Sequence, residues 1–403
     1  MKKNFSNYRG LPRSIYVLFW VQVINRFGDF VVPFLTLLLT QRLGFSFAVT
    51  GLIVMIASVI TIPASLLGGK YSDEIGRKKI YLFGQSLAAS FILLCGFVKN
   101  PLVITLFIML SSFFNGFVRP SLSAIVADVL PADKRQSGSS LIYLGINLGV
   151  AIGPVAAGFL FNNYLPLFFI GDAITSFVAI IIVSIFIKET NPMHIKSEAD
   201  NSLEKVAEGN LLKVLLKRPQ ILAFLSIYVL YCFVYTQWKF SLPIMLNKLF
   251  IEKGPARYGF LLSVNALTVI FLTIIILEIT KKYRPLTNII IGGVFYSIGF
   301  GMIGLIHSFS LFIVSTILWT IGEILIVTNF SVYLANNSPK NFRARINAVG
   351  NLSWATGAAL GTSLMGLYIN SVGINAVWPF VFVLSCISVV LMVVLQIYNL
   401  KVK

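Results

Sequence analysis

Charged residues are scarce in this chain, and so are the residues on which most catalytic sites depend. Only 11% of its 403 residues are charged, and it contains 14 acids, 3 cysteines and 2 histidines. The cysteines Cys95, Cys232 and Cys386 are far apart, which excludes a disulfide scaffold, and no group of ligands has metal-binding spacing. The sequence also lacks a nucleophile elbow and a phosphate-binding loop. We therefore expect no enzyme activity, no cofactor and no bound metal.

Hydrophobic residues dominate instead, at 57% of the chain. Apolar runs of about 20 residues recur along the whole length, and each could cross a hydrocarbon core of about 30 Å as a helix. This pattern predicts an all-α membrane protein with twelve transmembrane helices. The predicted spans are 14–40, 47–68, 80–98, 102–130, 138–162, 165–187, 220–247, 257–280, 287–306, 309–337, 345–370 and 376–398.

Most of the Lys and Arg residues that give the net charge of +18 lie in the loops between these spans. With the N-terminus placed inside, five Lys or Arg fall on the outer side: Arg42, Lys99, Lys248, Lys253 and Arg257. Three fall within spans (Arg26, Arg119 and Lys239), and the rest of the 32 lie on the inner side. This is the positive-inside bias of a multi-pass protein of a bacterial-type inner membrane with both termini in the cytoplasm. It removes the reason to expect a nucleic-acid partner.

The chain divides into two similar halves. The only long polar stretch predicts a cytoplasmic linker at 188–219 between six-helix bundles at 1–187 and 220–403. A shift of 208 residues brings identical residues together in the two halves. The pairs are Ser123/Ser331, Ala127/Ala335, Pro131/Pro339, Arg135/Arg343, Gly149/Gly357, Gly153/Gly361 and Gly158/Gly366. Parallel repeats of this kind are typical of transporters with a site near the membrane midplane.

The loop between the second and third spans carries the most specific motif. Residues 69–79 read Gly-Lys-Tyr-Ser-Asp-Glu-Ile-Gly-Arg-Lys-Lys. Its glycines suit sharp turns, and its cations favour the cytoplasmic side. The pattern G-x-x-x-D-x-x-G-R-[KR]-[KR] resembles the signature loop of the major facilitator superfamily of secondary transporters. The resemblance implies two pseudo-symmetric bundles and alternating access; a loop kept basic only for topology is the alternative.

The resemblance also implies that this loop is a conformational clamp. Arg77 would pair with Asp128 at the cytoplasmic end of the fourth span. In a state open to the outside, Asp73 would face the N-terminus of the eleventh span near residues 343–346, where helix-end amides attract an anion. The predicted clamp residues are Gly69, Asp73, Gly76, Arg77 and Asp128.

Glycine and proline mark the fifth span. Gly149, Gly153, Pro154 and Gly158 would let a neighbouring backbone approach closely and would bend the helix. They resemble the fifth-span motif of proton-coupled drug antiporters, which favours export. That motif ends in two adjacent glycines, where this chain has Ala157-Gly158. A tight helix crossing with no bearing on direction is the alternative.

Polar side chains within spans are costly in lipid and usually face a cavity or a partner. Proton coupling needs a carboxylate whose proton affinity responds to burial and to nearby charge. Glu323 and Asp29 are the candidates, and Arg26 could instead hold Asp29 in a structural pair. By the resemblance, the first, fourth, seventh and tenth spans line the cavity. The predicted cavity residues on them are Arg26, Arg119, Lys239, Asn115, Tyr235, Gln237 and Trp238.

Several of these residues have a second interpretation. Arg119 resembles the fourth-span arginine used for coupling in drug antiporters, or it holds an anionic part of the substrate. The aromatic residues could stack on a ligand or simply pack. Asp172, near the predicted outer end of the sixth span, is predicted to be a helix-end or packing acid.

Together these features predict a monomeric secondary transporter that couples protons to the efflux of small amphipathic or drug-like compounds. Its partners would be the substrate, protons and the lipid bilayer. One alternative is proton-coupled uptake of peptides or other small solutes, because Asn25-Arg26-Phe27 resembles part of the first-span motif of peptide importers. Another is a non-transporting receptor or lipid-handling protein on the same fold.

Overall fold

The computed structural model describes residues 10–131, 134–190, 215–339 and 342–401, and these residues form helices and no strands. Residues 191–214 lie outside the described residues, so most of the predicted linker has no structural counterpart here. The boundaries of the linker and of the two predicted bundles therefore stay predictions.

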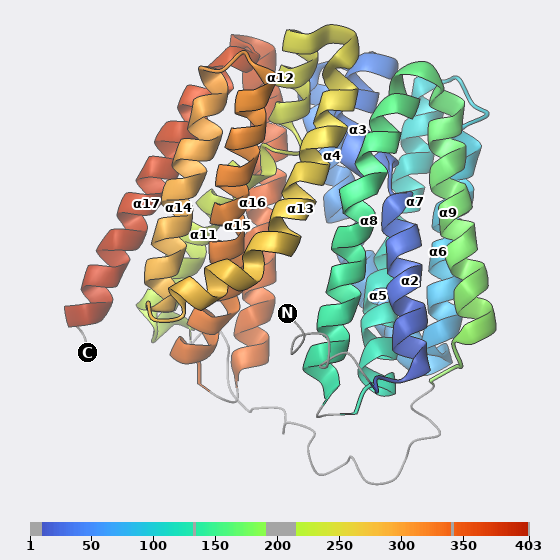
Figure 1. Cartoon of the computed structure of the whole chain (residues 1–403), viewed down its shortest axis with the longest axis horizontal. Helices are drawn as coiled ribbons and strands as arrows, with labels where there is room; N and C mark the ends of the chain where they lie inside the picture. Colours follow the sequence, from blue (N-terminus) through green and yellow to red (C-terminus); the bar gives the residue numbers. More distant parts are fainter. Residues whose placement is uncertain (1–9, 132–133, 191–214, 340–341, 402–403) are drawn as a thin grey trace. The chain divides into compact units, whose positions relative to one another are not determined.

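The helices of the first half follow the predicted spans closely (Figure 1). They are α2 (Arg13–Phe27), α3 (Val31–Leu37), the π-helical turn η1 (Leu38–Arg42), α4 (Phe47–Val59), α5 (Thr61–Ile75), α6 (Arg77–Cys95), α7 (Pro101–Val129), α8 (Arg135–Asn163) and α9 (Leu165–Phe186). Asn100 begins α7 as an N-cap, because its side chain accepts hydrogen bonds from the amides of Leu102 and Val103.

The second half repeats this order. Its helices are α11 (Pro219–Thr236), α12 (Ser241–Phe250), the short turn η4 (Ile251–Lys253), α13 (Gly254–Thr280), α14 (Pro285–Gly301), η5 (Met302–Gly304), α15 (Phe309–Asn337), α16 (Arg343–Val372), η7 (Ile374–Ala376) and α17 (Val377–Lys401). Pro219 and Pro285 each begin a helix at a position where the missing amide hydrogen costs nothing.

Nine helical segments of the described residues are long and apolar enough to cross a membrane. One of them, Pro219–Thr280, has 62 residues and holds both α11 and α13, so it is long enough for two crossings. Two further long helices fall outside this set: α6 begins with three cations, and α16 is rich in small and polar residues. Counting the long segment twice and adding α6 and α16 gives the twelve crossings expected from the sequence.

The chain forms two compact units that differ from a simple division into halves. Unit 1 contains residues 1–44, 56–198 and 252–267; unit 2 contains 45–55, 199–251 and 268–403. The first turns of α4 therefore belong to unit 2, and the first turns of α13 belong to unit 1.

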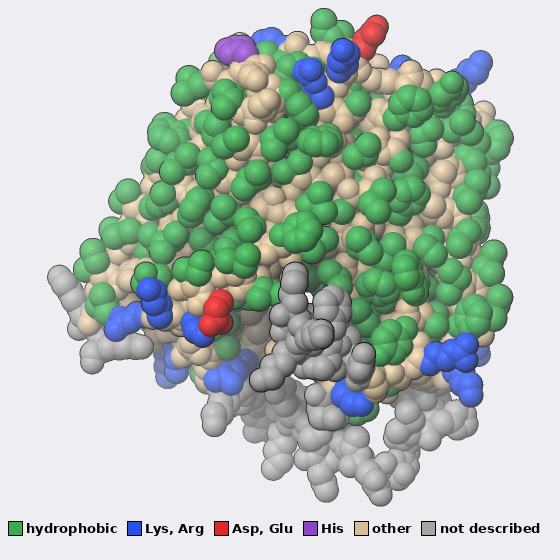
Figure 2. Space-filling model, viewed as in Figure 1, with side chains coloured by type: hydrophobic (Ala, Val, Ile, Leu, Met, Phe, Trp, Pro, Cys, Tyr) green, Lys and Arg blue, Asp and Glu red, His purple; other side chains and the backbone are tan. Residues whose placement is uncertain are grey.

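Within the units, helix packing repeats in the order that the sequence repeat predicts. In unit 1, α2 packs on α8 and α9, and α6 packs on α7 and α9. In unit 2, α11 packs on α16 and α17, and α14 packs on α15 and α17. Hydrophobic side chains cover most of the face shown in Figure 2, while Lys and Arg gather along its upper and lower edges. This distribution suits helices whose sides contact lipid.

Candidate functional site

The first span is broken near its middle. Helix α2 ends at Phe27 and α3 begins at Val31, so the amides that start α3 have no partner within their own helix. Gly28 sits at the break against α9, where a Cβ would lie 1.6 Å from the Thr175 hydroxyl oxygen. Only glycine leaves room for the Thr175 side chain at this position.

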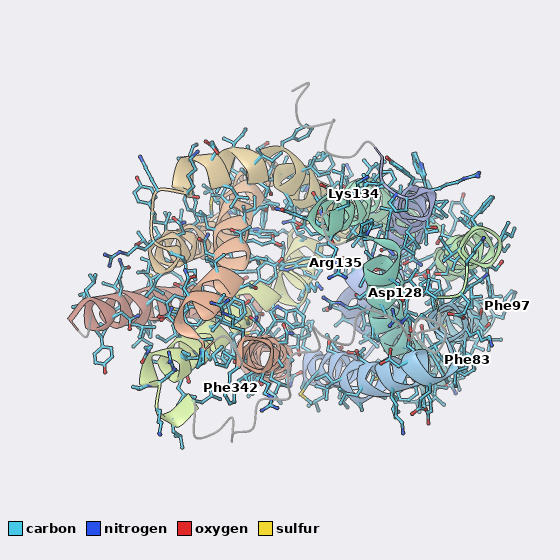
Figure 3. The ribbon with its side chains drawn as sticks, turned by 90° about the horizontal axis from the view of Figure 1, so that it is seen from below. Phe83, Phe97, Asp128, Lys134, Arg135 and Phe342 are labelled. Atoms are coloured by element: carbon cyan, nitrogen blue, oxygen red, sulfur yellow. The ribbon has the colours of Figure 1, made fainter. Side chains whose placement is uncertain are left out.

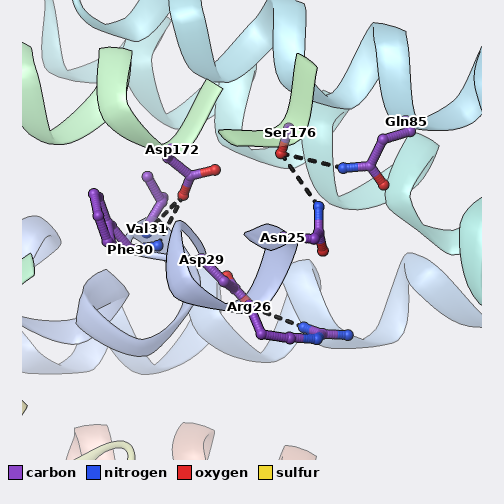
Figure 4. A network of polar contacts seen from close by, with 8 residues as sticks. All are labelled: Asn25, Arg26, Asp29, Phe30, Val31, Gln85, Asp172 and Ser176. Atoms are coloured by element: carbon purple, nitrogen blue, oxygen red, sulfur yellow. Dashed lines mark hydrogen bonds and ion pairs between the residues drawn. The ribbon is translucent and has the colours of Figure 1, made fainter. Parts of the chain in front are cut away.

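Asp172 of α9 closes this break from outside the helix (Figure 4). Its Oδ2 accepts hydrogen bonds from the amides of Phe30 and Val31, each at 3.0 Å. The side chain is 9% exposed, so a carboxylate from another helix serves as the N-cap of α3. The buried carboxylate packs against the broken span, which fits the packing acid expected from the sequence.

A polar network surrounds the break (Figure 4). Arg26 and Asp29 form an ion pair, with Nη1 and Oδ2 2.8 Å apart. The amide groups of Asn25 and Gln85 donate to the Ser176 hydroxyl at 3.5 and 3.2 Å. Asp29 and Asp172 repel each other electrostatically, and the ion pair with Arg26 offsets the charge of Asp29.

The glycines of the fifth span pack against the same break. A Cβ on Gly149 would lie 2.6 Å from the carbonyl oxygen of Val23. One on Gly153 would lie 2.1 Å from the carbonyl oxygen of Phe27. Gly158 instead meets the start of α13, with the Pro255 carbonyl oxygen 2.7 Å from its Cβ position. Each motif glycine thus permits a backbone contact within unit 1.

We expect Asp172→Leu to destabilise the protein by about 1–3 kcal/mol, because it leaves the buried Val31 amide without an acceptor and the Phe30 amide with only the Gly28 carbonyl oxygen. Asp172→Asn keeps one acceptor oxygen and should retain most of the stability. Thermal melting of the protein in detergent measures both effects. A Leu variant that melts at the same temperature as the Asn variant would contradict the capping role.

The seventh span has a break at the equivalent position in unit 2. Helix α11 ends at Thr236 and α12 begins at Ser241. Gln237, predicted as a cavity residue, is fully buried: its amide donates to the carbonyls of Phe233 and Gly361, at 2.9 and 3.1 Å, and it accepts from the Ser241 hydroxyl. Gln237 therefore holds the broken span against α16.

Next to this break lies an aromatic cluster drawn from the break itself and from three helices of unit 2. Tyr235 stacks on Tyr296 with ring centroids 5.7 Å apart. Trp238 stacks on Trp319 at 6.2 Å, and Trp319 stacks on Phe300 at 5.5 Å. We name these residues the Trp238–Trp319 cluster: Tyr235, Trp238, Tyr296, Phe300 and Trp319.

Two charged candidates adjoin this cluster. The Lys239 ammonium lies 4.9 Å from the centroid of the Trp238 ring, a cation–π distance. Glu323 is one helical turn beyond Trp319 on α15, is partly buried, and interacts electrostatically with Tyr296. Lys239 and Glu323, which were predicted separately from the sequence, thus adjoin the same cluster. Its members Tyr296, Phe300 and Trp319 were not predicted from the sequence.

Asn115 and Arg119 lie four residues apart on one face of α7, and both are exposed. The neighbouring Gly116 is packed: a Cβ there would lie 2.6 Å from Ala64 of α5. Their proposed roles in a substrate cavity stay predictions.

Most of the motif is helical and not a loop, because α5 runs to Ile75 and α6 begins at Arg77; only Gly76 makes the expected turn. Arg77 forms an ion pair with Asp128 at the end of α7, and its Nη2 lies 3.7 Å from Asp73. The side chain of Arg77 is 13% exposed and that of Asp128 is 22% exposed. Asp128 is labelled in the view from below (Figure 3). The expected Arg77–Asp128 pair is present; its role as a clamp stays a prediction.

Glu189 joins the end of the sixth span to this loop. Its carboxylate accepts from the amides of Lys78 and Lys79 at 3.0 and 3.1 Å, which caps α6. Gly76 has φ +131°, and a Cβ there would lie 2.7 Å from Glu189 Oε2. The loop therefore needs glycine at this position for both its backbone conformation and its contact.

We expect Gly76→Ala to lower the melting temperature by several degrees. The substitution forces an unfavourable φ and displaces Glu189 from the amides of α6. Gly69→Ala is the matched control, because nothing lies within 4 Å of the Cβ position at Gly69. Equal melting temperatures for the two variants would contradict the account of Gly76.

Comparison with known proteins identifies the family. A model of the Major Facilitator Superfamily matches residues 18–362. The uncharacterized MFS-type transporter YqjV of Bacillus subtilis (strain 168) is 24% identical over 331 residues, 80% of this chain and 79% of that protein. A Na(+), Li(+), K(+)/H(+) antiporter of Planococcus maritimus is 23% identical over 359 residues, 81% of this chain and 82% of that protein.

The fold agrees with this match. The crystal structure of a POT family transporter in complex with a thioalcohol-conjugated peptide superimposes with a TM-score of 0.79. It is 16% identical, and 98% of each chain is covered. The chain described here belongs to the Major Facilitator Superfamily, a family of membrane transporters and not of enzymes.

Proposed function

We propose that this chain is a proton-coupled secondary transporter that exports small amphipathic or drug-like compounds. The grouping of Glu323 with the Trp238–Trp319 cluster carries this proposal. A carboxylate beside aromatic rings that can stack on a ligand lets a proton and a substrate compete for one site. Exchange of a proton for a substrate across the membrane requires such competition.

Two further observations support export. The fifth-span glycines pack onto the break of the first span, so they serve the element that carries Asp29. The relative from Planococcus maritimus is named as an antiporter.

We propose that the protein works as a monomer in the cell membrane with both termini in the cytoplasm. A green fluorescent protein fused to the C-terminus would test the location of that end.

Everted membrane vesicles with an acidified lumen test the direction of transport. An exporter should carry a hydrophobic dye into the lumen and release protons, so the lumen becomes more alkaline when the dye is added. Vesicles from a strain that lacks the gene are the control. Growth of the two strains on peptides as sole nitrogen source tests uptake: dependence of growth on the gene, without proton release, would replace the export proposal.

A further inference from the structure

The Trp238–Trp319 cluster contains hydrogen-bond donors that have no acceptor within the described residues. The indole nitrogens of Trp238 and Trp319 are shielded from solvent, and neither has a hydrogen-bond partner. Trp319 is 1% exposed as a whole. A buried donor without a partner is energetically unfavourable, so such groups usually meet an acceptor in the working protein.

The surroundings restrict what that acceptor can be. The two indole rings are stacked with an interplanar angle of 13°, so an acceptor must approach their edges. Lys239 places a positive charge 4.9 Å from the Trp238 ring, and its side chain is exposed. An anionic oxygen is therefore favoured over a cationic group at this end of the cluster.

The rings themselves favour a flat ligand. Tyr235 and Tyr296 stack with an interplanar angle of 12°, and Tyr235 also meets the edge of Trp319. Tyr235 and Trp238 are only partly buried, so a ligand can reach their faces. A planar aromatic ring gains both hydrophobic burial and offset stacking against such a surface.

We infer that Trp238, Trp319 and Lys239 recognise the carboxylate of a planar aromatic substrate. The indole N–H groups donate to the carboxylate oxygens, Lys239 neutralises the charge, and the tyrosines contact the ring. Glu323 interacts electrostatically with Tyr296 of the same cluster. This inference rests on the proposed transport function.

Binding of 2-naphthoate to the purified protein in detergent, measured by calorimetry, tests the inference without any transport step. The amine 2-naphthylmethylammonium has a similar ring and the opposite charge. We expect the carboxylate to bind at least ten-fold more tightly than the amine. Trp238→Phe and Trp319→Phe, which keep an aromatic ring but remove the N–H donor, should each weaken naphthoate binding about ten-fold.

Trp378 provides a matched control. It is also fully buried, its indole nitrogen also has no partner, and it lies on α17 outside the cluster. Trp378→Phe should leave naphthoate binding unchanged, and thermal melting shows whether each variant is folded. Lys239→Gln should weaken naphthoate binding about ten-fold, and it does not depend on repacking a buried ring.

The inference is overturned by tighter binding of the amine or by equal losses in Trp378→Phe and Trp319→Phe. It is also overturned if both cluster variants bind naphthoate normally, since water would then satisfy the donors. Naphthoate binding with the expected variant effects but without gradient-driven movement would support this inference and reject the transport proposal. Gradient-driven export of other compounds that the Trp variants do not affect would reject only the inference.

Discussion

Glu323→Gln is expected to abolish substrate accumulation driven by a pH gradient, with a loss of at least ten-fold, while the protein stays folded. Glutamine has nearly the shape of glutamate, so the packing of α15 beside Trp319 should persist. It cannot exchange a proton at neutral pH, so the gradient can no longer bias the conformational equilibrium. Substrate binding should remain but should no longer vary with pH.

The matched control is Glu278→Gln on α13, an exposed acid that pairs with Lys281 outside the cluster. It should transport at the wild-type rate. Proteoliposomes with an imposed pH gradient provide the measurement, and thermal melting confirms folding. If the Glu323→Gln variant accumulates substrate normally, the coupling role moves to Asp29, which Asp29→Asn would then test.

The positions of the spans could be predicted because length and hydropathy act locally. A run of about 20 apolar residues forms a helix in lipid whatever surrounds it. The Arg77–Asp128 pair could be predicted for a different reason. Its residues belong to a motif whose resemblance to a family carries three-dimensional information, and the ion pair is present in unit 1.

The break in the first span could be predicted only in part. The sequence shows Gly28 and a charged neighbour, Asp29, within an apolar run. It does not show that Asp172, on another helix, supplies the acceptor for Phe30 and Val31. Such a cap depends on tertiary packing, and an isolated acid in a span gives no sign of its partner.

The repeat extends further than the sequence indicates. Gly51 and Gly259 are related by the same shift of 208 residues as the seven pairs found in the sequence. A Cβ on Gly51 would lie 2.5 Å from the carbonyl oxygen of Thr362, and one on Gly259 would lie 2.0 Å from that of Pro154. Thr362 and Pro154 are again 208 residues apart. A single glycine among unlike neighbours cannot be recognised as a repeat until its contact is known.

The aromatic cluster was the least predictable part of the site. In a chain with 34 Phe, 15 Tyr and 5 Trp, an aromatic residue is usually packing. Tyr296 and Trp319 become candidates only because they contact Tyr235 and Trp238 from two other helices. Contacts between helices far apart in the sequence carry this information.

Gly153→Ala is expected to reduce the yield of folded protein about ten-fold, because the added Cβ meets backbone and not a movable side chain. Its position would be 2.1 Å from the Phe27 carbonyl oxygen and 2.8 Å from the Phe27 carbonyl carbon. Overpacking costs about 1–3 kcal/mol or more when nothing nearby can move aside. Here α8 would have to separate from the broken end of α2.

The sequence repeat provides a matched position in unit 2 for comparison with Gly153. Gly361 is the equivalent of Gly153 in unit 2, but a Cβ there would lie 3.0 Å from the Phe233 carbonyl oxygen and 3.3 Å from the side-chain nitrogen of Gln237. Gly361→Ala should therefore be tolerated far better, and Val155→Leu, at an exposed position of α8, should have no effect. Fluorescence-detected size-exclusion chromatography of the three variants measures folded yield. Equal losses at Gly153 and Gly361 would mean that the motif glycine is needed for general helix packing and not for this contact with the first span.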